Sequence, residues 1–188
     1  TGVDKDASKI EALERGEIPI YEPGLEEVVE KNVRAGRLKF TTDLAPAIRE
    51  ARAVFIAVGT PPLPDGKADL SFVRQVAESI GDNLNGYKVI VTKSTVPVGT
   101  GQMVERAVRE HSGGKQEFAV VSNPEFLREG SAIEDFLRPD RVVIGARTQR
   151  AIDVMLDIYA PLKAAGVPFV VANVESAEMI KYASNGFL

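Results

Sequence analysis

Polar side chains that can take part in chemistry follow three apolar segments of the sequence. Thr60 follows the first segment, Thr95 the second and Glu125 the third. In an open α/β sheet, ligands dock at the carboxyl ends of strands, where backbone groups lack ladder partners. We therefore expect these side chains to line one site. Taken alone, the first motif also fits a rigid turn, because Gly59 and Pro61 favour one.

Two carboxylates lie four residues apart after the third segment. If residues 125–129 form a helical turn, Glu125 and Glu129 lie on one face of it. A carboxylate that is ionised and partly desolvated can act as a general base toward water. A solvated acidic surface is the ordinary explanation of such a pair, but the shared edge of the sheet favours a site.

The last helical segment carries a cation and an amide on one face. Lys181 and Asn185 are four residues apart, which is the spacing of neighbours along a helix. Together they can stabilise a developing oxyanion. By spacing alone, a surface lysine is the more common explanation.

The N-terminal residues have the pattern of a strand that ends in an acidic side chain, Asp4. In a dinucleotide-binding fold, an acidic residue at this place bonds the ribose hydroxyls, about twenty residues after a glycine-rich loop. That loop is not in the sequence. Capping of the next helix is the alternative role for Asp4, and Asp6 or Ser8 could also cap that helix.

These side chains must be positioned by alternating strands and helices. Segments rich in β-formers occur at 38–41, 53–58, 88–92, 118–121, 141–144 and 168–171. Helical periodicity occurs at 7–15, 25–35, 45–51, 72–83, 101–109, 150–162 and 176–188. Several strands are apolar on both faces, as in a parallel sheet that helices cover. The alternation predicts an α/β fold with a doubly wound, mostly parallel sheet and helices on both faces.

Composition excludes several classes of function. The net charge of −4 argues against nucleic acid or an anionic membrane as a partner. Without cysteine and with one histidine, His111, the chain offers no thiol nucleophile and little for a metal site. No apolar run approaches the ~20 residues that span a bilayer, so the cytoplasm is the expected compartment. Because the chain starts without methionine and ends inside a helical pattern, we expect a piece of a longer protein.

Five motifs occur in the order and approximate spacing of the UDP-glucose/GDP-mannose dehydrogenase family, which the chain resembles. They are PIYEPGLE at 19–26, VGTP at 58–61, KSTVPVGT at 93–100, NPEFLREG at 123–130 and EMIKYASN at 178–185. The resemblance covers essentially the whole chain. The third motif, with LRPDR at 137–141, is more similar to the UDP-glucose branch of the family than to the GDP-mannose branch.

The resemblance implies an NAD-binding, Rossmann-like domain over residues 1–174 that lacks its first strand and glycine-rich loop. Residues 175–188 would begin a central connecting helix through which the complete protein forms a homo-oligomer. The implied reaction is oxidation of a nucleotide-sugar C6 hydroxyl to a carboxylate, UDP-glucose giving UDP-glucuronate. Two NAD⁺ are used, and the path runs through an aldehyde and a thioester on a cysteine beyond residue 188. The alternatives are GDP-mannose or a UDP-N-acetylhexosamine as substrate, and a non-catalytic nucleotide-binding or assembly module.

The resemblance also implies roles for individual residues, and no metal ligands. Expected catalytic residues are Thr95 beside the reacting centre, Glu125 to activate water, and Lys181 and Asn185 to stabilise oxyanions. Expected cofactor contacts are Asp4, Lys9, Val58, Gly59, Thr60, Pro61, Ser94, Thr95 and Glu129. Expected substrate contacts are Glu125, Phe126, Leu127, Arg128, Glu129, Lys181 and Asn185.

Overall fold

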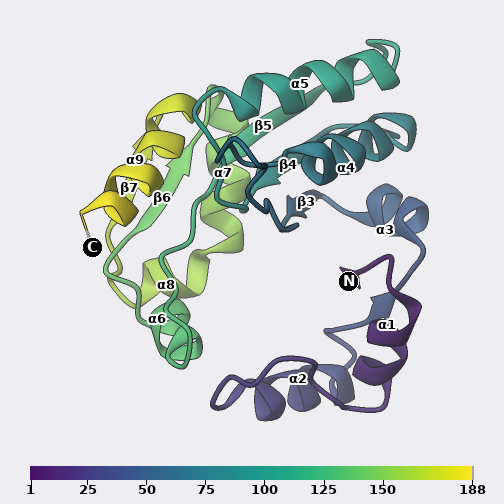
Figure 1. Ribbon diagram of the computed structural model, residues 1–188, viewed down its shortest axis with the longest axis vertical. Helices are drawn as coiled ribbons and strands as arrows, with labels where there is room; N and C mark the ends of the chain where they lie inside the picture. The colour runs from purple at the N-terminus through teal and green to yellow at the C-terminus, as the bar shows by residue number, and fades with distance from the viewer. Residues whose placement is uncertain (188) are drawn as a thin grey trace. The chain divides into compact units, whose positions relative to one another are not determined.

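The computed structural model describes residues 1–187, which divide into two compact units (Figure 1). The first unit comprises Thr1–Glu50 and Leu127–Pro139, and the second comprises Ala51–Phe126 and the chain from Asp140 onward. Leu188, the last residue of the expected final helix, lies outside the described residues. Within 1–187, no helix has the length and apolar character needed to cross a bilayer.

The second unit is built on a five-stranded sheet. Its strands, in spatial order, are β3 (Ala53–Ile56), β4 (Lys88–Thr92), β5 (Phe118–Ser122), β6 (Val142–Gly145) and β7 (Phe169–Ala172). Strands β3, β4 and β5 are parallel, and β6 and β7 are parallel to each other. Strands β5 and β6 are antiparallel where Ser122 faces Gly145. The sheet is therefore mostly parallel, as the sequence predicts.

Helices cover both faces of this sheet. They are α4 (Ser71–Asp82), α5 (Thr100–His111), α7 (Gln149–Ile158), α8 (Ala160–Ala164) and α9 (Val174–Gly186). Helices α4 and α5 lie side by side, α5 packs on β5, and α9 packs on β5 and β6 (Figure 1). A Cβ added to Gly101 of α5 would lie 2.6 Å from Val174 of α9 and 3.8 Å from Val120 of β5. Helices α5 and α9 therefore meet on the face toward which Val120 points.

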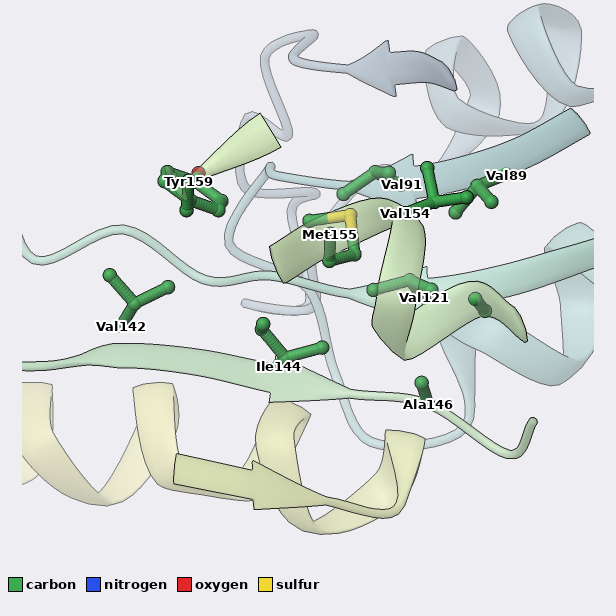
Figure 2. Close-up of a cluster of buried hydrophobic side chains, with 10 residues drawn as sticks. Val89, Val91, Val121, Val142, Ile144, Ala146, Val154, Met155 and Tyr159 are labelled. Carbon is green, nitrogen blue, oxygen red and sulfur yellow. The ribbon is translucent and has the colours of Figure 1, made fainter. Parts of the chain in front are cut away.

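The opposite face carries the main apolar core. Figure 2 shows Val89, Val91 and Val121 of the parallel strands gathered with Val154 and Met155 of α7. All five side chains are buried. Alternate residues of a strand point to opposite faces, so the odd-numbered valines pack against α7 while Val120 packs against α5 and α9. The continuous apolar runs in the sequence follow from this two-sided burial.

The first unit is smaller. Strands β1 (Gly2–Val3) and β2 (Phe40–Thr41) form a parallel pair. The helices of this unit are α1 (Ala7–Glu14), α2 (Leu25–Arg34), α3 (Leu44–Glu50) and α6 (Ala132–Leu137). The Glu22 carboxylate accepts the backbone N–H groups of Gly130 and Ala132 at the start of α6, at 2.8 and 2.7 Å.

Three sequence expectations differ from the structure. The helix expected over 150–162 is two helices, α7 and α8, because Pro161 stands in the first turn of α8 and has no N–H to donate to α7. The strand expected over 53–58 ends at Ile56. The helical turn considered for 125–129 is absent, since 123–128 have no regular secondary structure. The helix that follows, α6, was not predicted.

Candidate functional site

Two loops at the carboxyl edge of the sheet are tied together by hydroxyl groups. The Ser94 hydroxyl, after β4, donates to the carbonyl of Val58, after β3, at 2.6 Å. The Thr60 hydroxyl donates to the carbonyl of Thr95 at 2.9 Å. The structure therefore brings these expected cofactor contacts together. Both hydroxyl protons are already used within the protein, which leaves oxygen lone pairs for a ligand.

The remaining residues of the first loop lie beside this tie. Val58 is half-buried, whereas Gly59 and Pro61 are exposed. The Pro61 carbonyl accepts the N–H of Asp69 at 2.8 Å, which fixes the far end of the loop.

Lys181 and Glu125 form the central pair of the candidate site. The Lys181 ammonium group donates to the Glu125 carbonyl at 2.6 Å and lies 3.4 Å from the Glu125 carboxylate oxygen Oε1. The Lys181 side chain is only 9% exposed, against 29% for that of Glu125. The ammonium also lies 5.3 Å from the centre of the Phe126 ring. Since a buried lysine with a carboxylate partner is not a solvated surface group, the functional interpretation of Lys181 is favoured.

Helix α9 places other side chains along the same stretch. Asn185 follows Lys181 by about one turn and is exposed, so a ligand can reach its amide. Glu178 precedes Lys181 by about one turn and is 2% exposed. Its carboxylate accepts the backbone N–H groups of Gly99 and Gly101 at the start of α5, both at 2.7 Å. Helix α9 is therefore fixed to the loop after β4 and to the loop after β5.

The Glu178 carboxylate occupies the positive end of α5. Burial raises the pKa of Glu178, and the two backbone hydrogen bonds oppose that rise. An added side chain at Gly101 would meet Val174 at 2.6 Å and the Glu178 carboxylate at 3.2 Å. Glycine at 101 therefore permits the close approach of the two helices.

A buried polar cluster lies next to the central pair. The Lys93 ammonium donates to the Asn123 side-chain oxygen and to the Tyr159 hydroxyl, both at 3.3 Å. The Tyr159 hydroxyl donates to the same Asn123 oxygen at 2.6 Å, and the Asn123 amide donates to the Val143 carbonyl at 2.8 Å. The cluster thereby joins the loops after β4 and β5 to the end of α7.

Burial perturbs both titratable groups of this cluster. Desolvation lowers the pKa of Lys93 to about 8, with Glu125 opposing the change and Lys181 adding to it. Desolvation also raises the pKa of Tyr159 to about 12, so its hydroxyl stays a proton donor at neutral pH. A lysine pKa lowered from 10.5 to about 8 means that burying the charged form of Lys93 destabilises the folded state by ~3 kcal/mol.

In the first unit, Asp4 stands at the end of β1 as expected. Its carboxylate accepts the Lys9 ammonium at 2.7 Å and the Asp6 backbone N–H at 3.0 Å. The Lys9 hydrogen bond is the main reason that the pKa of Asp4 is lowered. Asp6, and not Asp4, caps α1, because its side chain accepts the N–H groups of Ser8 and Lys9. Asp4 is therefore left with an ionised, partly exposed carboxylate.

The remaining expected substrate contacts separate into the two units. Glu125 and Phe126 belong to the second unit, whereas Leu127, Arg128 and Glu129 belong to the first. Arg128 forms a salt bridge with Asp135 at 2.7 Å. Glu125 and Glu129 do not share a helix face, because no helical turn links them. The condition for a shared helix face is therefore not met, and the role of each carboxylate stays a prediction.

Sequence reasoning assigned no role to four residues of this region: Lys93, Asn123, Tyr159 and Glu178. Two signals in the sequence bear on them. Lys93 comes directly after a strand whose residues are all apolar or β-branched apart from its first, and Glu178 lies one helical turn before Lys181. Neither signal distinguishes a buried charge from a surface charge.

The Asp4 carboxylate has the chemistry needed to bind a ribose of NAD. Ribose hydroxyls are proton donors, and Asp4 offers carboxylate oxygens with lone pairs beyond those used by Lys9 and Asp6. Within residues 1–187, no group of three or more His, Asp or Glu side chains is arranged to hold a metal ion.

Residues 1–163 match the model of the UDP-glucose/GDP-mannose dehydrogenase family, NAD binding domain. The chain belongs to this family. The match confirms both the predicted family and NAD as the cofactor of the domain. A UDP-glucose dehydrogenase from the archaeon Pyrobaculum islandicum has the same fold, with a TM-score of 0.94 and 48% identity over 99% of this chain and 43% of that one.

Other relatives carry the names of two branches of the family. UDP-glucose 6-dehydrogenase TuaD of Bacillus subtilis (strain 168) is 54% identical over 98% of this chain and 40% of its own length. GDP-mannose dehydrogenase from Pseudomonas aeruginosa is 37% identical, with a TM-score of 0.93, over 99% of this chain and 43% of its own. The family member described here thus spans about two fifths of the length of these relatives.

Proposed function

We propose that the protein containing this chain oxidises the C6 hydroxyl of a nucleotide sugar to a carboxylate, and that UDP-glucose is its substrate. The observation that supports this most is the buried Lys181 ammonium held against Glu125 at the carboxyl edge of the sheet. The reaction balances as one alcohol, two NAD⁺ and one water giving one carboxylate, two NADH and three protons.

Lys181 and Asn185 are assigned to the oxygen on which negative charge develops. A primary alcohol must lose its proton as the hydride leaves, so its oxygen becomes more negative during oxidation. The Lys181 ammonium is desolvated and fixed in place, and preorganised donors of this kind stabilise charge in the transition state. Asn185 supplies a neutral donor from the next turn of α9.

Glu125 is assigned to activate the water that is consumed. A general base must be ionised and must reach the proton that it removes. The Lys181 ammonium lies 3.4 Å from Oε1, and the Glu125 side chain retains 29% exposure through which water can arrive. Thr95, on the loop tied to Thr60, is assigned to the side of the reacting carbon.

The expected cofactor contacts keep their assignment. When bound, NAD supplies the acceptor for the hydride that leaves C6. Asp4 accepts hydrogen bonds from the ribose hydroxyls, with Lys9 as its neighbour. The other assigned contacts are Val58, Gly59, Thr60, Pro61, Ser94, Thr95 and Glu129.

The choice of UDP-glucose rests on the sequence of the chain and on its relatives. The KSTVPVGT and LRPDR segments resemble the UDP-glucose branch, and the TuaD protein at 54% identity is named for that substrate. GDP-mannose is the second candidate, because a dehydrogenase named for it superposes with a TM-score of 0.93.

The first prediction is that the full-length protein forms two NADH for each UDP-glucose consumed. GDP-mannose and UDP-N-acetylglucosamine should react at least ~10-fold more slowly by kcat/KM, which corresponds to ~1.4 kcal/mol of discrimination. NADH formation is followed by absorbance and the sugar product by mass spectrometry. Faster turnover of GDP-mannose would replace the proposed substrate, and absence of NADH with all three would favour the non-catalytic module.

The same assay tests the assigned role of Lys181. Lys181→Ala should lower kcat by ~10²-fold or more, because the ammonium acts mainly in the transition state. Lys163→Ala, an exposed lysine of α8, is the matched control and should stay within about twofold of the wild type. If kcat is the same for the two variants, Lys181 contributes to packing and not to the reaction.

A further inference from the structure

The polar atoms around the buried Lys93 ammonium group have other hydrogen-bond partners. Without the lysine, the Tyr159 hydroxyl still donates its 2.6 Å hydrogen bond to the Asn123 side-chain oxygen. The Asn123 amide still donates to the Val143 carbonyl. Hence no polar atom of this cluster loses its last partner if Lys93 is removed. Packing alone would be served as well by an apolar side chain of the same length, such as methionine.

Lys93 is nevertheless charged in a place where charge is disfavoured. Its neighbours with titratable or charged groups come from three other segments: Tyr159 from the end of α7, Glu125 from the loop after β5, and Lys181 from α9. Of these, only the Glu125 carboxylate attracts the ammonium as an anion. The ammonium is therefore held by Asn123 and Tyr159, with Glu125 as the anion that attracts it.

We propose that Lys93 is a positioning residue for the reaction, which acts through Asn123 and Glu125. Its hydrogen bond to Asn123 holds the loop segment that presents Glu125 two residues later. Its charge adds positive potential near Glu125, where negative charge grows on the substrate. This inference rests on the proposed function, because it assigns Lys93 to the same reaction.

The arrangement carries a signature that a structural lysine would lack. Lys93→Met in the full-length protein removes a desolvated charge and leaves the Tyr159 hydrogen bond intact. It should therefore raise the midpoint of urea unfolding, or leave it unchanged, while lowering kcat by ~10-fold or more. KM for UDP-glucose should stay within about threefold, since the proposal assigns Lys93 no contact with the substrate.

A pH profile gives the second arm of the test. Burial lowers the pKa of Lys93 to about 8, so kcat should fall as pH rises through this value in the wild type. Lys93→Arg keeps the charge to far higher pH and should shift that decline upward. Tyr159, with its pKa raised to about 12, does not contribute in this range.

The outcomes separate this inference from the proposed function. Wild-type turnover alone decides the proposed function and involves no substitution at Lys93. With an active wild type, a destabilised Lys93→Met variant, or one whose kcat is within twofold, would overturn the positioning role. An alkaline decline near pH 8 that persists unchanged in a folded Lys93→Arg variant would overturn it as well. Raised stability together with lowered kcat would support it.

Discussion

The ion pairs Lys181–Glu125 and Lys9–Asp4 differ in how far they are exposed to solvent. Lys181 is almost fully buried against Glu125, whereas the Lys9 and Asp4 side chains are 42% and 34% exposed. Exposed pairs contribute little to stability, so the pair in the first unit is better explained by recognition than by folding. A carboxylate at the end of β1 accepts ribose hydroxyls but repels a phosphate in the same place.

We therefore expect the full-length protein to prefer NAD to NADP, and Asp4 to be the cause. Asp4→Ser should reduce the ratio of kcat/KM for NAD over NADP by about 10-fold or more, because it removes the repelling charge and releases Lys9 to pair with the 2′-phosphate. Asp6→Ser is the matched control, since serine also caps helices and the ratio should hold. A wild type that prefers NADP would contradict the assignment.

At the scale of elements, helix α9 organises the site through successive turns. Glu178 fixes the start of α5, and Lys181 fixes the loop after β5. Both attachments depend on buried charged groups, and no other described side chain accepts the Gly99 and Gly101 N–H groups. Losing the first attachment would therefore leave the buried N–H of Gly101 and the partly buried N–H of Gly99 without a side-chain acceptor.

Glu178→Gln should lower the free energy of unfolding by ~1–3 kcal/mol, because one N–H group then faces the amide nitrogen in place of an oxygen. Chemical denaturation measures the change. Glu175→Gln, one turn earlier and more exposed, should cost less than ~1 kcal/mol. If the two variants are equally stable, the hydrogen bonds to α5 contribute no net stability.

This change should also depend on pH. Burial raises the pKa of Glu178, so the folded protein holds that proton more tightly than the unfolded chain does. The stability contributed by this group is complete below the ordinary pKa of 4.5 and is lost as pH rises through the folded value. The wild type should therefore exceed Glu178→Gln by more in acid than at neutral pH.

The elements of the second unit were predictable because local signals agree with the fold. Apolar segments that end in glycine, proline or hydroxyl residues mark β3 and β4, and both strands are present. Lys181 and Glu125 were singled out by motif, but their contact depends on packing between residues 56 apart. Lys93 was missed because its partner Tyr159 is 66 residues away. The start of α6 was missed for the same reason, since its capping carboxylate, Glu22, is over 100 residues distant.

At the scale of the whole molecule, the two sides of α9 differ in character. One side packs on the sheet through Ala177, while Met179 and Tyr182 are 55% and 44% exposed. Exposed apolar side chains on a helix favour association with another surface. The homo-oligomer expected through this helix stays a prediction.

We expect Tyr182→Glu to reduce the mass of the full-length protein in solution, because a buried carboxylate would be desolvated without a partner. Light scattering coupled to size-exclusion chromatography measures that mass. Ile158→Glu, at an exposed apolar position of α7, should leave the mass unchanged. A protein that is monomeric before any substitution would contradict the prediction.

The residues of the first unit that we expect to select the cofactor are contiguous in the chain. Asp4, its partner Lys9 and the helix cap Asp6 lie within six consecutive residues. The hydrogen bonds made to the Asp4 and Asp6 side chains run among residues 4–9, and the Asp4 backbone N–H donates to the Thr41 carbonyl of β2 at 3.3 Å. The hydrogen bonds that hold the Asp4 and Asp6 side chains therefore come from the same segment. We therefore expect that transplanting residues 4–9 into a homologous domain whose sheet also offers a carbonyl to residue 4 would transfer the preference for NAD.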